Sequence, residues 1–115
     1  MTLQNPPAGY PVMSGIILTT LITAIVHLSF GIPLFILNGL GYLGLLVLLY
    51  APLAVLQRFR PAVRIALIGY TLLTIVLYFV MGPPFTAVGL LTKAVEAVLV
   101  ALLVVEAGRA RSAAR

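Results

Sequence analysis

Residues 12–30 read VMSGIILTTLITAIVHLSF, a run without a single Lys, Arg, Asp or Glu. A helix of about 20 apolar residues spans the roughly 30 Å hydrocarbon core of a bilayer. Three further apolar runs of similar length follow, at residues 38–56, 62–81 and 86–107. The sequence therefore predicts an all-α transmembrane four-helix bundle. It forms a single domain over residues 1–115, with a short N-terminal tail and a basic C-terminal tail.

The composition supports this prediction. Hydrophobic residues make up 63% of the chain and charged residues 8%, against about 45–50% and about 25% in a typical soluble domain. Most of the surface must therefore face lipid. The chain has no cysteine, which excludes disulfides, cysteine metal sites and thiol nucleophiles. A single histidine cannot form a bis-histidine haem site within one chain, and we expect no cofactor or metal.

The breaks between the runs contain proline and glycine. Gly31 and Pro33 end the first run, and Gln57-Arg58-Phe59-Arg60-Pro61 forms the second break. Gly82-Pro83-Pro84 is a rigid turn signal after the third run, and Pro52 is expected to bend the second helix near its end. Connections this short favour antiparallel neighbours, so the predicted topology is up-down-up-down.

Cations gather on one side of the predicted membrane. With four spans, the N-terminus, the second break and the C-terminus share a side, and six of the seven Lys and Arg residues lie there. The positive-inside rule then predicts a multi-pass cell-membrane protein with both termini in the cytoplasm. No contiguous basic face with base-reading polar residues is visible, so we expect no nucleic-acid partner. The membrane-surface basic residues are Arg58, Arg60, Arg64, Arg109, Arg111 and Arg115.

Two opposite charges lie within the fourth run, although a charge at the centre of a membrane helix costs roughly 2.5–3.5 kcal/mol. Lys93 and Glu96 are three residues apart, so they share a helix face, where an ion pair lowers that cost. The pair is either a structural contact inside the bundle or a site for a proton or ligand. Intramembrane ionisable residues often mark pathways, and both interpretations stay open.

The first run contains a stripe of small and polar residues spaced four apart. Such a stripe favours close packing and interhelical hydrogen bonds, so His27 is predicted to point inward, as a packed residue or as a ligand. Because the first run crosses outward and the fourth inward, His27 and Glu96 can share the outer half and form a hydrogen bond. The stripe is Gly15, Thr19, Thr23 and His27. The candidate buried polar cluster is His27, Asn38, Tyr42, Tyr78, Lys93 and Glu96.

Small residues also recur in the second and fourth runs, where they permit close approach of helix backbones. The spacing of Gly39, Gly41 and Gly44 matches a dinucleotide-binding fingerprint, but that motif needs a preceding strand in a βαβ unit. We interpret the glycines as packing positions. The predicted helix-packing residues are Gly15, Thr19, Thr23, Gly41, Gly44, Ala97 and Ala101.

Four short stretches carry a family resemblance. They are Ala24-Ile25-Val26-His27-Leu28, the residues 34–43 (LFILNGLGYL), the residues 70–78, and Lys93-Ala94-Val95-Glu96. Together they resemble small four-helix membrane proteins of prokaryotes, which implies that fold without implying an activity. Length and helix count are also similar to those of small multidrug resistance transporters. Those proteins use a carboxylate in their first helix, where this chain has His27 and no Asp or Glu.

Three functions remain open from the sequence. The first is a structural subunit or homo-oligomer that packs against other membrane helices, with the lipid bilayer and other membrane proteins as partners. The second is a small proton-linked transporter in which Glu96 titrates, Lys93 is its partner and His27 relays the proton. The third is a binder of an apolar ligand such as a quinone or lipid, with His27 and Tyr78 as polar handles. No catalytic triad or carboxylate dyad is present, so an enzyme is not expected.

Overall fold

The described part of the chain folds into four long helices and one short helix. The structure, a computed structural model, describes residues 9–82 and 85–114. No strand occurs among these residues, which confirms the predicted all-α class. The helices are α1 (Tyr10–Ser29), α2 (Pro33–Tyr50), α3 (Ala54–Gln57), α4 (Arg60–Met81) and α5 (Ala87–Ala114).

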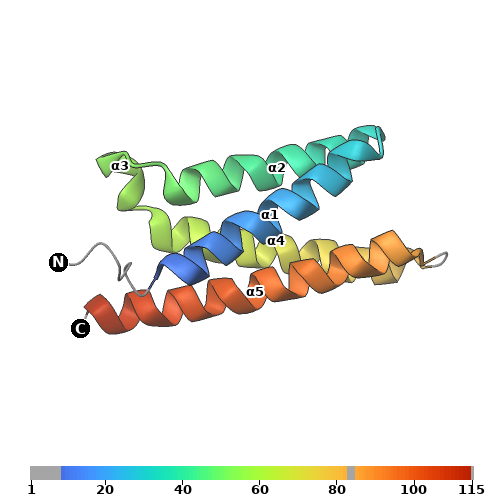
Figure 1. The fold of residues 1–115 in the computed structure, drawn as a ribbon. Helices are drawn as coiled ribbons and strands as arrows, with labels where there is room; N and C mark the ends of the chain where they lie inside the picture. Colours follow the sequence, from blue (N-terminus) through green and yellow to red (C-terminus); the bar gives the residue numbers. More distant parts are fainter. Residues whose placement is uncertain (1–8, 83–84, 115) are drawn as a thin grey trace.

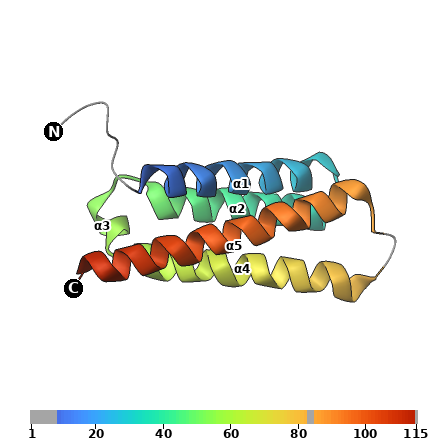
Figure 2. The same cartoon turned by 60° about the horizontal axis from the view of Figure 1, so that its bottom comes forward.

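The four long helices lie side by side and form a ring of contacts. Helix α1 packs against α2 and α5, and α4 packs against the same two helices (Figure 1, Figure 2). The start of α1, the end of α5 and the short α3 lie at one end of the molecule (Figure 1). The turn between α1 and α2 and the end of α4 lie at the other.

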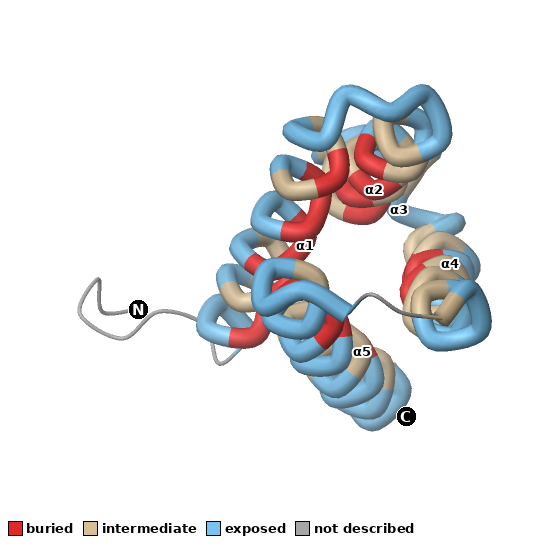
Figure 3. Tube along the Cα trace, turned by 90° about the vertical axis from the view of Figure 1, so that its right-hand side faces the viewer, coloured by how far each residue is buried: buried red, intermediate tan, exposed pale blue. Residues whose placement is uncertain are grey.

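The core is a narrow strip along the inner faces of the long helices (Figure 3). Ile16, Leu49, Leu67, Leu99 and Leu103 are fully buried there. The outward faces are also apolar, and many large hydrophobic side chains on them are about half exposed or more. By length and composition, all four long helices are suited to cross a membrane.

Helix α2 begins and ends earlier than the predicted run of residues 38–56. It begins at Pro33, because proline is well suited to the first turn of a helix, and Gly31 turns the chain just before it with a φ of +69°. Pro52 ends this helix rather than bending it. Ala51 adopts an extended ψ of 131°, because proline disfavours the α conformation in the residue before it. Residues 54–57 consequently form α3.

The other boundaries agree better with the sequence, apart from the C-terminal end. Helices α1 and α4 match residues 12–30 and 62–81 to within two residues at each end. Helix α5 continues well past residue 107, to Ala114, so the described part of the basic tail is helical; the predicted surface residue Arg115 lies outside the described residues. Alanine and arginine, which dominate this segment, are among the strongest helix formers.

Four of the predicted packing residues lie between helices. Thr19 and Thr23 are buried on α1. A side-chain carbon added at Gly15 would lie 2.8 Å from Leu102 Cδ1 on α5, so only glycine permits this approach without a shift. One added at Gly41 of α2 would overlap the hydroxyl of Tyr70 on α4.

The packing prediction is wrong, within one copy of the chain, for Gly44, Ala97 and Ala101. All three are exposed, and the space around Gly44 is open to 4 Å. The buried stripe of α5 is formed by Glu96, Leu99 and Leu103. Ala97 and Ala101 lie beside this stripe, on the outer surface of the bundle. This inward face brings the buried Glu96 to its polar partners on α1 and α4, as a buried carboxylate requires.

Candidate functional site

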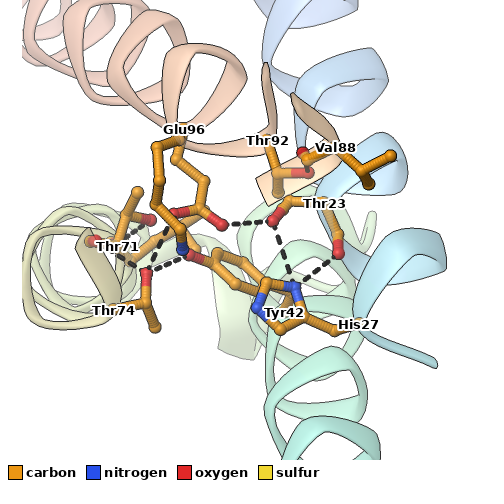
Figure 4. A network of polar contacts seen from close by, with 10 residues as sticks. Thr23, His27, Tyr42, Thr71, Thr74, Val88, Thr92 and Glu96 are labelled. Atoms are coloured by element: carbon orange, nitrogen blue, oxygen red, sulfur yellow. Dashed lines mark hydrogen bonds and ion pairs between the residues drawn. The ribbon is translucent and has the colours of Figure 1, made fainter. Parts of the chain in front are cut away.

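Glu96 of α5 is fully buried and receives hydrogen bonds from three helices (Figure 4). Its Oε2 accepts a 2.6 Å hydrogen bond from the Thr23 hydroxyl of α1. Its Oε1 accepts one of 2.7 Å from Lys93 Nζ and one of 3.2 Å from the Thr74 hydroxyl of α4. A buried carboxylate is strongly unfavourable unless paired and hydrogen-bonded, and here both oxygens are satisfied.

Lys93 forms the ion pair expected from its spacing to Glu96. Its side chain is only 8% exposed, and its ammonium lies over the ring of Tyr78, 5.2 Å from the centroid. The negative face of an aromatic ring attracts a cation, most strongly where water is excluded. Lys93 is thus held between a carboxylate on its own helix and an aromatic ring on α4.

His27 is buried, but it does not contact Glu96 as predicted. Its Nδ1 lies 2.7 Å from the Thr23 carbonyl oxygen, so Nδ1 carries a proton and donates to that oxygen. The same nitrogen lies 3.4 Å from the Thr23 hydroxyl, which is bonded to Glu96. Thr23 therefore bridges His27 and Glu96, because the histidine is turned back onto its own helix.

Tyr42 joins the network through Thr74 and does not reach Glu96 directly. Its hydroxyl lies 2.9 Å from the Thr74 Oγ1, and its ring packs edge-on against Tyr70, 4.8 Å between centroids. Thr74 has one proton and two acceptors within reach, the Thr71 carbonyl and Glu96. Tyr42 must therefore act as the donor in its contact with Thr74.

Beside this network lies a cavity of about 540 Å³, which we call the His27 cavity. His27, Asn38, Tyr78 and Lys93 line it, together with apolar side chains from α1, α2 and α4. Four of the six residues of the predicted polar cluster thus face one space. Tyr42 and Glu96 do not line it and form part of the network behind its wall.

Two polar atoms at this cavity are buried without a hydrogen-bond partner among the described residues. They are the side-chain oxygens Oδ1 of Asn38 and the hydroxyl of Tyr78. The backbone carbonyl of Asn38, by contrast, accepts a 2.7 Å hydrogen bond from Tyr70. Leaving a buried polar atom unpaired costs about 1–3 kcal/mol.

The threonines of α4 were not among the residues predicted from the sequence. Thr71 is fully buried, and the Thr74 hydroxyl connects Tyr42 with Glu96 (Figure 4). Hydroxyl side chains three apart share one helix face, and that spacing in an otherwise apolar run was the available signal. Hydroxyls are inexpensive in a membrane helix because they can bond to carbonyls of their own helix, as Thr71 does to Leu67.

The opposite end of the molecule holds a second polar cluster. Arg64 was predicted to lie at the membrane surface, but it is buried with 6% exposure. Its Nε donates to Glu106 Oε1 at 2.9 Å, and Tyr50 donates to Glu106 Oε2 at 2.6 Å. Arg64 lies one turn inside α4, on the face that meets α5. Its ion pair with Glu106 therefore lies between these two helices and not at the membrane surface.

Comparison of the chain with models of known families, with characterised proteins and with solved structures finds no match. Any function must therefore be inferred from the geometry of the two polar clusters.

Proposed function

We propose that the chain is an integral membrane protein whose four long helices cross the bilayer as an up-down-up-down bundle. The support is the length and apolar character of α1, α2, α4 and α5 and their exposed apolar faces. Lipid can solvate such a surface, whereas water cannot do so favourably. Recovery of the folded protein in the supernatant of a carbonate-washed lysate, without detergent, would refute this proposal.

We propose further that both termini lie in the cytoplasm. The start of α1, the end of α5 and the start of α4 lie at one end of the molecule (Figure 2). Arg58, Arg60 and Arg109 belong to this end, and basic residues are retained on the cytoplasmic side. Cysteines introduced at Ser112 and Ser29 test the orientation, because the chain has no other cysteine. An impermeant thiol reagent applied to intact cells should label only Ser29→Cys.

Within the membrane, the protein is proposed to bind an apolar ligand that has one polar end, such as a quinone or a lipid. The observation that carries this proposal is the His27 cavity, which combines apolar walls with Lys93 and with Asn38 and Tyr78, whose buried side-chain oxygens lack a partner among the described residues. Ligand pockets typically combine apolar walls with a few convergent polar groups. The cavity has that character, and it lies at the end that the proposed orientation places outward.

The polar groups of the cavity define the end of the ligand that they would contact. Lys93 has three N–H donors, of which Glu96 accepts one. The Tyr78 hydroxyl can also donate, and Asn38 Oδ1 can accept. A ligand head with a carbonyl or carboxylate oxygen and a neighbouring hydroxyl or amine satisfies all three groups. A quinone–quinol couple and a lipid head group both fall within this class.

The test is the content of the purified protein. Protein isolated in mild detergent is extracted with organic solvent, and the extract is analysed by mass spectrometry. We expect a small apolar compound near one per chain in the wild type and a large loss of it in Tyr78→Phe. The matched control is Tyr50→Phe, which removes a tyrosine hydroxyl at the other end of the molecule. Equal content in both variants, or no compound in the wild type, would overturn the proposal.

The same purification tests the subunit function that the sequence also allowed. Gly44, Ala97 and Ala101 give the outer surface positions of low bulk, at which another membrane helix can approach closely. A protein that co-purifies in fixed ratio, or a stable homo-oligomer, supports a role in assembly. A monomer that contains no apolar compound and has no protein partner contradicts both functions.

A second candidate, proton-linked transport, is favoured by one observation. The Thr23 hydroxyl lies 2.6 Å from Glu96 Oε2 and 3.4 Å from His27 Nδ1, so it connects the buried carboxylate with a residue at the cavity wall. Such a chain is the arrangement that a proton relay needs, and intramembrane carboxylates and histidines often have that role. Reconstituted Glu96→Gln and His27→Ala variants should then lose pH-driven uptake. Transport that persists in both variants would contradict this candidate.

A further inference from the structure

A second cavity lies at the arginine-rich end, away from the His27 cavity. It has a volume of about 400 Å³, and residues at the ends of α1, α2, α4 and α5 line it. We call it the arginine cavity. Its polar lining consists of Tyr10, Tyr50, Arg60, Arg64, Glu106 and Arg109.

Among the described residues, Glu106 supplies the carboxylate of this lining, and each of its oxygens accepts a hydrogen bond. Glu106 Oε1 accepts from Arg64 and Oε2 accepts from Tyr50. In the described part of the lining, the less exposed Arg60 and Arg64 lie beside this one carboxylate, so two cations share a single negative charge. Positive charge in a partly buried site is unfavourable unless an anion compensates it. The lining therefore favours an anionic ligand.

Two of the arginines are held in place by their Nε atoms. Arg64 Nε is bound to Glu106, and Arg60 Nε donates 2.7 Å to the carbonyl of Leu49. That carbonyl lies in the last turn of α2, where helix carbonyls have no amide partner. Both contacts leave the Nη amino groups available for a further acceptor. Guanidinium groups fixed in this way suit the oxygens of a phosphate, which they bind in pairs.

We infer that the arginine cavity binds a phosphate group, supplied either by the head group of an anionic lipid or by free phosphate. The walls from α1 support the lipid source, because Val12 and Met13 give the cavity an apolar side. The proposed cytoplasmic location also supports it, since that leaflet carries the anionic lipids. This inference does not depend on the ligand of the His27 cavity.

The test uses two double variants of equal net charge. Arg60→Gln/Arg109→Gln removes two arginines of the cavity, whereas Arg58→Gln/Arg111→Gln removes two exposed arginines that do not line it. Full-length protein in a zwitterionic detergent is titrated with phosphatidylglycerol or phosphatidylcholine and examined by native mass spectrometry. We expect one phosphatidylglycerol per chain and at least about tenfold weaker binding in the cavity variant, the factor expected for one charged hydrogen bond.

The control outcomes separate a site from diffuse surface charge. Equal losses in the two double variants, or equal binding of the two lipids by the wild type, would overturn the inference. Loss of the Arg60 contact could prevent folding of the first double variant. The comparison is therefore repeated with two single variants of exposed α5 residues, Arg109→Gln and Arg111→Gln. Inorganic phosphate is added as a competitor. Displacement of the lipid at millimolar phosphate supports the free-phosphate source, and retention supports the lipid source.

Discussion

The hydroxyl of Thr23 donates a 2.6 Å hydrogen bond to Glu96 Oε2, joining residues 73 positions apart in the chain. Thr23 lies on α1 and Glu96 on α5, so this bond links the first and last long helices at a buried point. It also fixes which carboxylate oxygen remains for Lys93 and Thr74, which both donate to Oε1. The bond is therefore the contact that orients the carboxylate.

We predict that Thr23→Val destabilises the protein by about 1.5–3 kcal/mol, because a hydrogen bond to a charged group is lost while the shape is retained. The measurement is unfolding by SDS titration from mild-detergent micelles. Thr20→Val is the matched control. Thr20 is fully buried on the same helix, but its hydroxyl donates only to the Ile16 carbonyl. Equal destabilisation by the two variants would show that the bond to Glu96 contributes no more to stability than the bond of Thr20 to a backbone carbonyl.

We predict that Glu96→Gln alone destabilises the protein by about 3–5 kcal/mol, because it leaves the Lys93 ammonium buried beside a neutral group. Adding Lys93→Met should recover a substantial part of that loss, since the double variant has no unpaired charge at this site. Arg111→Met changes an exposed cation of the same helix and should stay within about 0.5 kcal/mol. Additive effects of Glu96→Gln and Lys93→Met would contradict the coupling that their 2.7 Å contact implies.

The four long helices could be predicted from the sequence, but not all of their ends or the faces that they bury. Apolar runs of membrane-spanning length are visible without any tertiary information, and α1 and α4 follow them closely. Pro33 and Pro52 were visible as well, but whether a proline starts, bends or ends a helix depends on the backbone around it. Here Pro33 starts α2 and Pro52 lies beyond its end.

The candidate site, too, could be predicted only in part from the sequence. Spacing along one helix predicted that Lys93 and Glu96 pair, because both residues lie on α5. Partners from other helices could not be assigned in this way, since a shift of about one turn changes which side chains meet. His27 was therefore predicted to form a hydrogen bond with Glu96, whereas the structure has Thr23 bonded to Glu96. Arg64 likewise found its partner, Glu106, only through the packing of α4 on α5.

Tyr78→Phe is predicted to leave stability unchanged or to raise it slightly. The Tyr78 hydroxyl is buried without a partner among the described residues, so its removal takes away an unpaired polar group. Tyr50→Phe should destabilise by about 1.5–3 kcal/mol, because the Tyr50 hydroxyl donates 2.6 Å to the Glu106 carboxylate. The measurement is the same SDS titration on protein freed of bound apolar compounds. A destabilised Tyr78→Phe would indicate that the hydroxyl has a structural partner.

Gly41 and Gly44 of α2 were both predicted to be packing positions, but their surroundings differ. Gly44→Ala should stabilise by about 0.4–1 kcal/mol, because the space around Gly44 is open and alanine restricts the unfolded chain. Gly41→Ala should destabilise by about 1–3 kcal/mol, since the new methyl group would overlap the Tyr70 hydroxyl.

Displacing Tyr70 also breaks its 2.7 Å hydrogen bond to the Asn38 carbonyl, at the edge of the His27 cavity. Tyr70→Phe added to Gly41→Ala should relieve only part of the strain, because Tyr70 Cζ would still lie 2.9 Å from the methyl carbon. Apolar-compound content should therefore fall in Gly41→Ala and remain at the wild-type level in Gly44→Ala. If both alanine variants have the same stability and the same content, α2 and α4 do not approach each other at Gly41 as the structure has them.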